Sequence, residues 1–241
     1  MIFLHTNDLH GKLTDAAAAV IAKLRNDADF YFDSGDCVKA GNMAAPRSPE
    51  PVWGLLEACR CSASVPGNRE FHISAAGFRA KLAGCVHPVV CANLKWNGEP
   101  RGLLLASADP AAVDPLLPEV VFEDVGVFGL MVPMVTTRMA ARHISAFVNT
   151  SPFDEAQACV QRLRGEGNTV ICLSHLGASK DRDLAAKVDG IDIIFGGHSH
   201  DLLDPPIKVG STWICQSGSY AHQVGRYRYE SGDLKAEFIP L

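Results

Sequence analysis

The 241-residue sequence is long enough for one large domain or two small ones, and it can bury roughly 70 to 75% of the surface that its unfolded chain exposes. Hydrophobic residues make up 47% and charged residues 20%, a balance that excludes disordered, collagen-like and coiled-coil proteins. The net charge of −5 provides no overall positive field for a nucleic-acid backbone. We therefore expect no obvious nucleic-acid surface.

The eight cysteines are too few for a small disulfide-rich scaffold. Cys85, Cys91, Cys172 and Cys215 lie in or beside apolar runs, where cysteine is usually a small core residue, so we predict mostly free thiols. No stretch approaches 18 apolar residues, and the polar residues within the first ten leave no room for the apolar region of a signal peptide. These features predict a cytoplasmic location and no membrane contact.

Strands and helices alternate along the first half of the chain. Apolar runs predict strands over residues 2–7, 29–33 and 86–94, and helical spacing predicts helices over 15–25, 51–60 and 74–83, the last capped by Ser74. Residues 38–51 contain three prolines and predict a long loop. Loops of this length in compact domains usually have a function.

The second half continues the α/β pattern. It predicts a hairpin from 120–123 and 125–131, a helix over 151–164, buried strands over 169–173 and 191–195 with a short helix between them, and closing antiparallel strands at 212–215 and 227–238. Residues 96–118 are rich in Pro, Gly and Ala and predict a surface excursion. No domain boundary is evident.

Five polar clusters follow predicted strands, at residues 8–10, 33–36, 67–70, 174–175 and 196–200. Ligands of α/β sheets gather at the carboxyl ends of the strands, where loops converge over a rigid platform. Side chains two residues apart in extended chain point to the same side, so D-x-H and H-x-H pairs can approach one ion or two adjacent ions. Carboxylates, an amide oxygen and imidazoles suit manganese, iron or zinc. Any one cluster is a weak signal, but all five together predict a metal site.

The sequence resembles the 5′-nucleotidase branch of the calcineurin-like metallophosphoesterases over nearly its whole length. The motifs that carry the resemblance occur in order at residues 5–11 (HTNDLHG), 33–36 (DSGD), 67–71 (GNREF), 174–177 (SHLG), 196–200 (GGHSH) and 216–220 (QSGSY). The resemblance implies an α/β fold, a four-layer α/β/β/α sandwich, as a single metallophosphoesterase domain over residues 1–241.

The resemblance also implies a centre of two divalent metal ions, such as Mn, Zn or Fe, on one edge of this fold. By position, Asp8, His10 and His200 would bind one ion, Asn68, His175 and His198 the other, and Asp36 would bridge them. The implied reaction is in-line attack on phosphorus by a metal-held hydroxide, without a covalent enzyme intermediate.

Two positions depart from the family pattern. The family usually has Gly-Asn-His-Glu, with an aspartate three residues after the histidine; these positions are Arg69 and His72 here. Arginine can bind a phosphoryl oxygen but cannot release a proton at neutral pH. We therefore predict that Arg69 binds the transferring group and that His72 is the candidate acid, with a loop-packing pair as the alternative.

Nucleotidases of this family usually carry a further C-terminal domain that stacks the nucleobase, and none is expected within residues 1–241. A smaller substrate, an open site for diverse phosphoesters and a partner chain that completes the substrate pocket all remain open.

The leading interpretation is a phosphomonoesterase for nucleotides or related small phosphates. The alternatives are a phosphodiesterase, including one for cyclic nucleotides; a thiosulfohydrolase; and a non-catalytic metal-binding module.

Other polar and aromatic residues are given weaker interpretations. His5 lies within the first strand and is expected to be a satisfied core histidine. Asp183 is a candidate supporting partner of His175. Tyr220 follows a family-like turn, for which a structural role is favoured over substrate contact. The three tryptophans are expected to pack rather than to stack a base.

Overall fold

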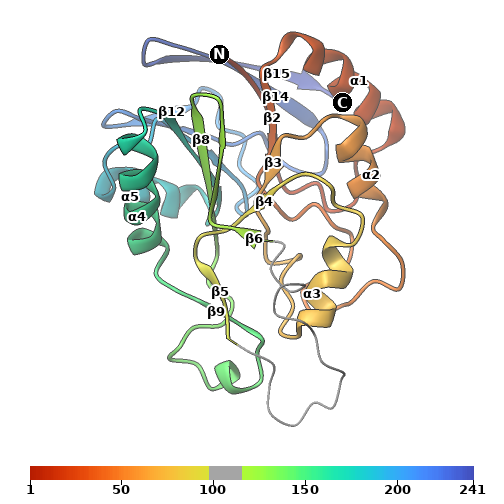
Figure 1. Ribbon diagram of the computed structural model, residues 1–241. Coiled ribbons are helices and arrows are strands. Elements are labelled where there is room, and N and C mark those ends of the chain that lie inside the picture. The colour runs from red at the N-terminus through yellow and green to blue at the C-terminus, as the bar shows by residue number, and fades with distance from the viewer. Residues whose placement is uncertain (98–115) are drawn as a thin grey trace.

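The computed structural model describes residues 1–97 and 116–241. Most of the surface excursion predicted over 96–118 lies outside these residues. Within the described chain, two β-sheets lie face to face, and helices cover the outer face of each (Figure 1). The predicted four-layer α/β/β/α sandwich is confirmed.

The first sheet has seven strands among the described residues. In spatial order they are β15 (Asp233–Pro240), β14 (Gln223–Glu230), β1 (Ile2–Thr6), β2 (Phe30–Asp33), β3 (Ala63–Ser64), β4 (Val89–Val90) and β6 (Leu116–Leu117). Neighbouring strands from β1 to β6 are parallel, whereas β14 and β15 are antiparallel to their neighbours. The outer face of this sheet packs against α1 (Asp15–Leu24), α2 (Pro51–Ala58) and α3 (Ala75–Leu82).

The second sheet has six strands in the described part of the chain. In order they are β12 (Ile207–Val209), β13 (Thr212–Cys215), β11 (Ile193–Gly196), β10 (Thr169–His175), β8 (Val125–Met131) and β7 (Glu119–Phe122). The four central strands are parallel. Helices α4 (Pro152–Gly165) and α5 (Ala178–Lys187) cover its outer face, on the opposite side of the molecule from α1 and α2 (Figure 1). The remaining elements are β5 (Leu94–Trp96) paired with β9 (Phe147–Asn149), and short 3-10 turns over Arg25–Asp27 and Ala140–His143.

Alternation along the strands explains the three hydrophobic layers. In β1, Phe3 faces the second sheet and Leu4 faces the helices; in β10, Ile171 faces the first sheet and Val170 faces α4 and α5. Because both faces of each sheet are covered, these strands carry apolar residues on both faces rather than alternating apolar with polar residues. The core between the sheets holds the strands rigidly, and their carboxyl ends carry the polar clusters.

The predicted strand over 86–94 is wrong in extent. Strand β4 ends at Val90: Cys91 N still donates to Leu117 O in the first sheet at 2.7 Å, but Ala92 N donates to Gly129 O in the second sheet at 2.7 Å. The Asn93 side chain then hydrogen-bonds to the main chain of Met131 at the end of β8, as a neighbouring strand would. It accepts from Met131 N at 2.9 Å and donates to Met131 O at 2.8 Å. A hydrophobic run therefore crosses between sheets here.

Candidate metal centre

The loops that follow β1 and β2 interlock through main-chain hydrogen bonds. Asp8 N donates to Gly35 O at 2.9 Å, His10 N to Asp36 O at 2.8 Å and Gly11 N to Cys37 O at 2.7 Å. These bonds continue the parallel pairing of the strands into the loops. They fix the side chains of Asp8, His10 and Asp36 at one edge of the fold.

Five of the seven predicted metal ligands have a left-handed backbone. The φ angles are 53° at Asp8, 50° at His10, 54° at Asp36, 73° at His198 and 59° at His200. Each such residue costs on the order of 1–2 kcal/mol relative to ordinary backbone, and such strain gathers at functional sites. The surrounding hydrogen bonds hold these side chains in positions that an unstrained loop would not give them.

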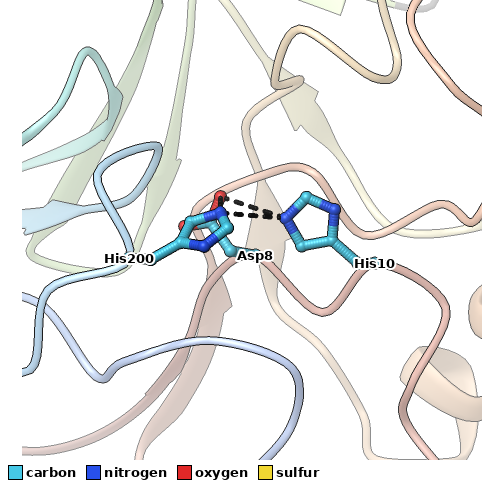
Figure 2. Close-up of side chains that lie close together, drawn as sticks. All are labelled: Asp8, His10 and His200. Carbon is cyan, nitrogen blue, oxygen red and sulfur yellow. Dashed lines mark hydrogen bonds and ion pairs between the residues drawn. The ribbon is translucent and has the colours of Figure 1, made fainter.

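Asp8, His10 and His200 converge, and Figure 2 shows their side chains pointing toward one another. His200 Nε2 lies 3.3 Å from Asp8 Oδ1, and His10 Nε2 lies 3.7 Å from the same oxygen. The Nε2 atoms of the two histidines are 3.1 Å apart. The ring of Tyr220 packs against both imidazoles, with centroids 5.0 and 5.2 Å away.

Asp8, Asp36 and the fully buried His175 form a second group next to the first. His175 Nε2 lies 3.4 Å from Asp36 Oδ1 and 4.0 Å from Asp8 Oδ1. On the other side of Asp36, Oδ2 lies 4.0 Å from His10 Nε2. Asp36 therefore approaches a histidine of each group, and Asp8 belongs to both groups.

Asn68 and His198 complete the arrangement. Asn68 Oδ1 lies 3.0 Å from His198 Nδ1, and the His198 ring lies 5.1 Å from that of His175. The structure thus brings together all seven residues that the sequence motifs single out, from the loops after β1, β2 and β11, the turn after β3 and the last residue of β10.

Several buried polar atoms of this cluster have no hydrogen-bond partner among the described residues: Asp8 Oδ1, His10 Nδ1 and His175 Nε2. A buried polar atom without a partner is costly, and a cation satisfies such atoms as ligands. Two of these atoms, Asp8 Oδ1 and His175 Nε2, face the same point. Two carboxylates, an amide oxygen and four imidazoles match the ligand preferences of divalent Mn, Fe or Zn. The residues present fit a metal centre.

Charges within the cluster shift its pKa values in opposite directions. Burial lowers the pKa of His175, but the carboxylates of Asp36 and Asp8 outweigh it, so that the pKa of His175 lies above its usual value. Burial raises the pKa of Asp8, but the contact with His10 and the charge of His175 outweigh burial and lower it. Carboxylates and imidazoles therefore stabilise one another's charged forms at this point.

Two residues to which the sequence interpretation gave no role hold the centre in place. Ser34 O accepts from His175 Nδ1 at 2.6 Å, so the neutral ring presents the lone pair of Nε2 to the centre. The buried carboxylate of Glu70 accepts from Asp36 N at 2.9 Å, Gly67 N at 2.8 Å and Val38 N at 3.1 Å. The only sequence signal for Glu70 was its place in the motif at 67–70.

Arg69 lies beside the predicted bridging residue. The main-chain N–H of Arg69 donates to Asp36 Oδ1 at 2.7 Å. In the side chain, Nε lies 4.0 Å from Asp36 Oδ2, and one terminal NH₂ group donates to Lys39 O at 3.0 Å. The side chain is 30% exposed, so guanidinium donors remain for a ligand at the edge of the centre.

The contacts of His72 and Asp183 are with residues other than the seven predicted metal ligands. The Nδ1 atom of His72 accepts from Ser74 N at 3.0 Å at the start of α3, so its proton is on Nε2 in the neutral ring. The supporting role considered for Asp183 is wrong, because this residue pairs with Lys180 at 3.2 Å and His175 is held by Ser34 instead.

His5 is a core residue, as predicted. It is fully buried and hydrogen-bonded to Ser217 Oγ at 2.8 Å and Ser34 Oγ at 2.9 Å. All eight cysteines are free thiols, also as predicted. None of the helices in the described residues is both long and apolar enough to cross a membrane.

Comparison with known proteins identifies the family of the chain. Residues 1–202 match the family model of the calcineurin-like phosphoesterases. The trifunctional nucleotide phosphoesterase protein YfkN of Bacillus subtilis is 28% identical over 92% of this chain and 17% of its own length. A human 5′-nucleotidase is 26% identical over 86% of this chain and 40% of its own length. The chain thus spans less than half of these relatives.

Among solved structures, the 5′-nucleotidase precursor of Thermus thermophilus superposes with a TM-score of 0.75 at 21% identity, covering 100% of this chain and 54% of that one. This likeness concerns the fold. The match of residues 1–202 to the family model shows that the chain belongs to the calcineurin-like phosphoesterase family.

Proposed function

We propose that the protein is a phosphoester hydrolase whose centre binds two divalent cations, one at Asp8, His10 and His200, the other at Asn68, His175 and His198, with Asp36 between them. The observation that carries the proposal is the convergence of unpartnered buried atoms, Asp8 Oδ1 and His175 Nε2, on a point flanked by Asp36. Nothing in the packing of a hydrophobic core requires these groups to meet.

Cations bound here would neutralise charge on the phosphoryl oxygens and provide a nucleophile from water at neutral pH. The protein's own residues position the ligands and bind the substrate. Asp36 fixes the spacing between the two ligand groups, Ser34 and Glu70 hold the ligands rigidly, and Arg69 binds a phosphoryl oxygen through its free guanidinium donors. The Nε2 proton of His72 is the candidate for transfer to the leaving group.

The proposed substrates are phosphate monoesters of nucleotides or related small phosphates. The names of the matched relatives, a nucleotide phosphoesterase and a 5′-nucleotidase, support this class. A phosphodiesterase is the second candidate. It is favoured by Arg69, which cannot protonate a leaving group, because esters with good leaving groups need little protonation.

Hydrolysis of a chromogenic phosphate monoester and diester with added manganese tests the proposal, with wild type beside Asp36→Asn. Turnover by wild type that is lost in Asp36→Asn is the expected result, and the ratio of the two rates selects between monoesterase and diesterase. Bound manganese without turnover of either ester would instead favour a non-catalytic metal-binding module.

A further inference from the structure

Lys81 is completely buried, yet no ion pair joins it to a carboxylate within residues 1–97 and 116–241. Its Nζ donates to three main-chain carbonyls instead: Gly41 at 2.7 Å, Asn42 at 3.0 Å, and Arg69. Burying an ammonium group is costly unless all its protons are accepted, and three carbonyls accept them here. Lys81 therefore ties the loop at 41–42 to the turn that carries Asn68 and Arg69.

The same loop is fastened a second time by Glu50. The buried carboxylate of Glu50 accepts from Ala40 N at 2.9 Å and Lys39 N at 3.2 Å. The main chain on both sides of residue 41 is thus hydrogen-bonded to the protein interior. The first part of the long loop predicted over 38–51, residues 38–42, is therefore held in place next to the centre.

Asn42 extends from this fixed main chain to a predicted ligand. Asn68 Nδ2 donates to Asn42 Oδ1 at 3.0 Å, while Asn68 Oδ1 faces His198 Nδ1 at 3.0 Å. A cation binds the oxygen of an amide and is repelled by its NH₂ group. The acceptor on Asn42 holds the NH₂ end of Asn68 away from the centre, so that the oxygen end faces it.

We propose that Asn42, held in place by Lys81, is a positioning residue that selects the amide orientation of Asn68 and thereby strengthens binding of the second cation. The proposal rests on the two-cation centre proposed above. Partners of metal ligands typically change metal affinity by about 10-fold or more when removed.

Calorimetric titration of metal-free protein with Mn²⁺ provides the test. We expect wild type to bind two ions, and Asn42→Ala to bind one of them about 10-fold more weakly with the other unchanged. Asn42→Asp keeps an oxygen acceptor at the same place and should restore affinity, including at molar salt, where the effect of its added charge is screened. Met43→Ala, an exposed residue of the same loop, is the matched control and should bind as wild type.

Lys81→Met tests whether the hydrogen bonds of Lys81 hold the loop that carries Asn42. It should increase proteolytic cleavage within residues 38–50 and weaken Mn²⁺ binding as Asn42→Ala does; should it fail to fold, the Asn42 variants decide alone. Two ions bound by Asn42→Ala with wild-type affinity would refute the role of Asn42 while leaving the two-cation centre intact. A wild-type protein that binds one ion would refute the centre itself, and this assignment with it.

Discussion

The Nε2 atoms of His10 and His200 lie 3.1 Å apart, although 190 residues separate them in the sequence. The two nitrogens can form a hydrogen bond only if one of them carries a proton, because two unprotonated imidazole nitrogens repel each other. A cation between them, with Asp8 Oδ1 as a further ligand, accounts for the arrangement.

Metal removal should therefore destabilise the protein. At a Mn²⁺ concentration 100 times the dissociation constant, one bound ion raises the free energy of unfolding by about 2.7 kcal/mol. For a chain of this size we expect the melting temperature to rise by about 5–10 °C over that in chelator. Differential scanning calorimetry measures the shift. An equal shift in Asp36→Asn would show that the ion acts elsewhere.

Gly67→Ala should displace two of the predicted metal ligands by a steric clash. A Cβ atom at this position would lie 2.2 Å from Asp36 Oδ1 and 2.7 Å from His175 Nε2, so both side chains must move. We expect at least a 10-fold loss of Mn²⁺ affinity, measured by titration. Gly54→Ala is the control: its added methyl group meets no described atom within 4 Å, and it should stabilise α2 by about 0.5–1 kcal/mol. Unchanged metal binding in Gly67→Ala would contradict the geometry.

Arg69→Ala should lower kcat/KM by about 100-fold on every ester that turns over, the usual effect of removing one donor to a developing oxyanion. Arg69→Lys should recover only part of the loss, because lysine keeps the charge without the planar fork. Steady-state kinetics measures both, with the exposed Arg47→Ala as control. A wild-type kcat/KM in Arg69→Ala would end the proposed role.

His72→Asn separates catalysis from packing. The Asn oxygen can replace Nδ1 as acceptor for Ser74 N, but the side chain has no acidic proton to supply. If His72 protonates the leaving group, kcat falls by about 10²- to 10⁴-fold for alkyl phosphates and little for nitrophenyl phosphate, with the melting temperature unchanged. An equal effect on both substrates would contradict the acid role.

Because His5 is buried without its proton, we expect the free energy of unfolding to decrease at acidic pH. Burial lowers the pKa of His5 to about 3, whereas the unfolded chain takes up this proton near the ordinary value of about 6.5. Between these values the unfolded state binds more protons, so the free energy of unfolding decreases as pH falls, by up to about 1.4 kcal/mol per pH unit.

Urea unfolding at pH 6 and pH 4.5 in chelator measures this dependence for wild type and His5→Gln, whose amide does not titrate. The other titrating groups are common to both proteins, so the wild type should show the steeper fall. Equal falls would show that His5 is protonated in the folded protein.

Much of the fold was predictable from local patterns. Helix α4 begins after Ser151, whose side chain accepts from Asp154 N, and α3 begins after Ser74 in the same way, because capping depends on residues only three apart. The strand predicted through residue 94 fails because Val90 and Ala92 pair with different sheets, a choice that no local pattern records.

The sequence by itself determined which residue types stand at the strand ends, since D-x-H and H-x-H spacing and the flanking glycines are local properties. Only the tertiary structure decided what holds them: the carbonyl of Ser34 on His175, the carboxylate of Glu70 beneath Asp36, and Lys81 fastening the loop of Asn42 to the turn of Asn68. These contacts join segments 12 to 141 residues apart. They depend on how the two sheets pack against each other. This packing is determined by the burial of hydrophobic side chains from the whole chain, which no local pattern records.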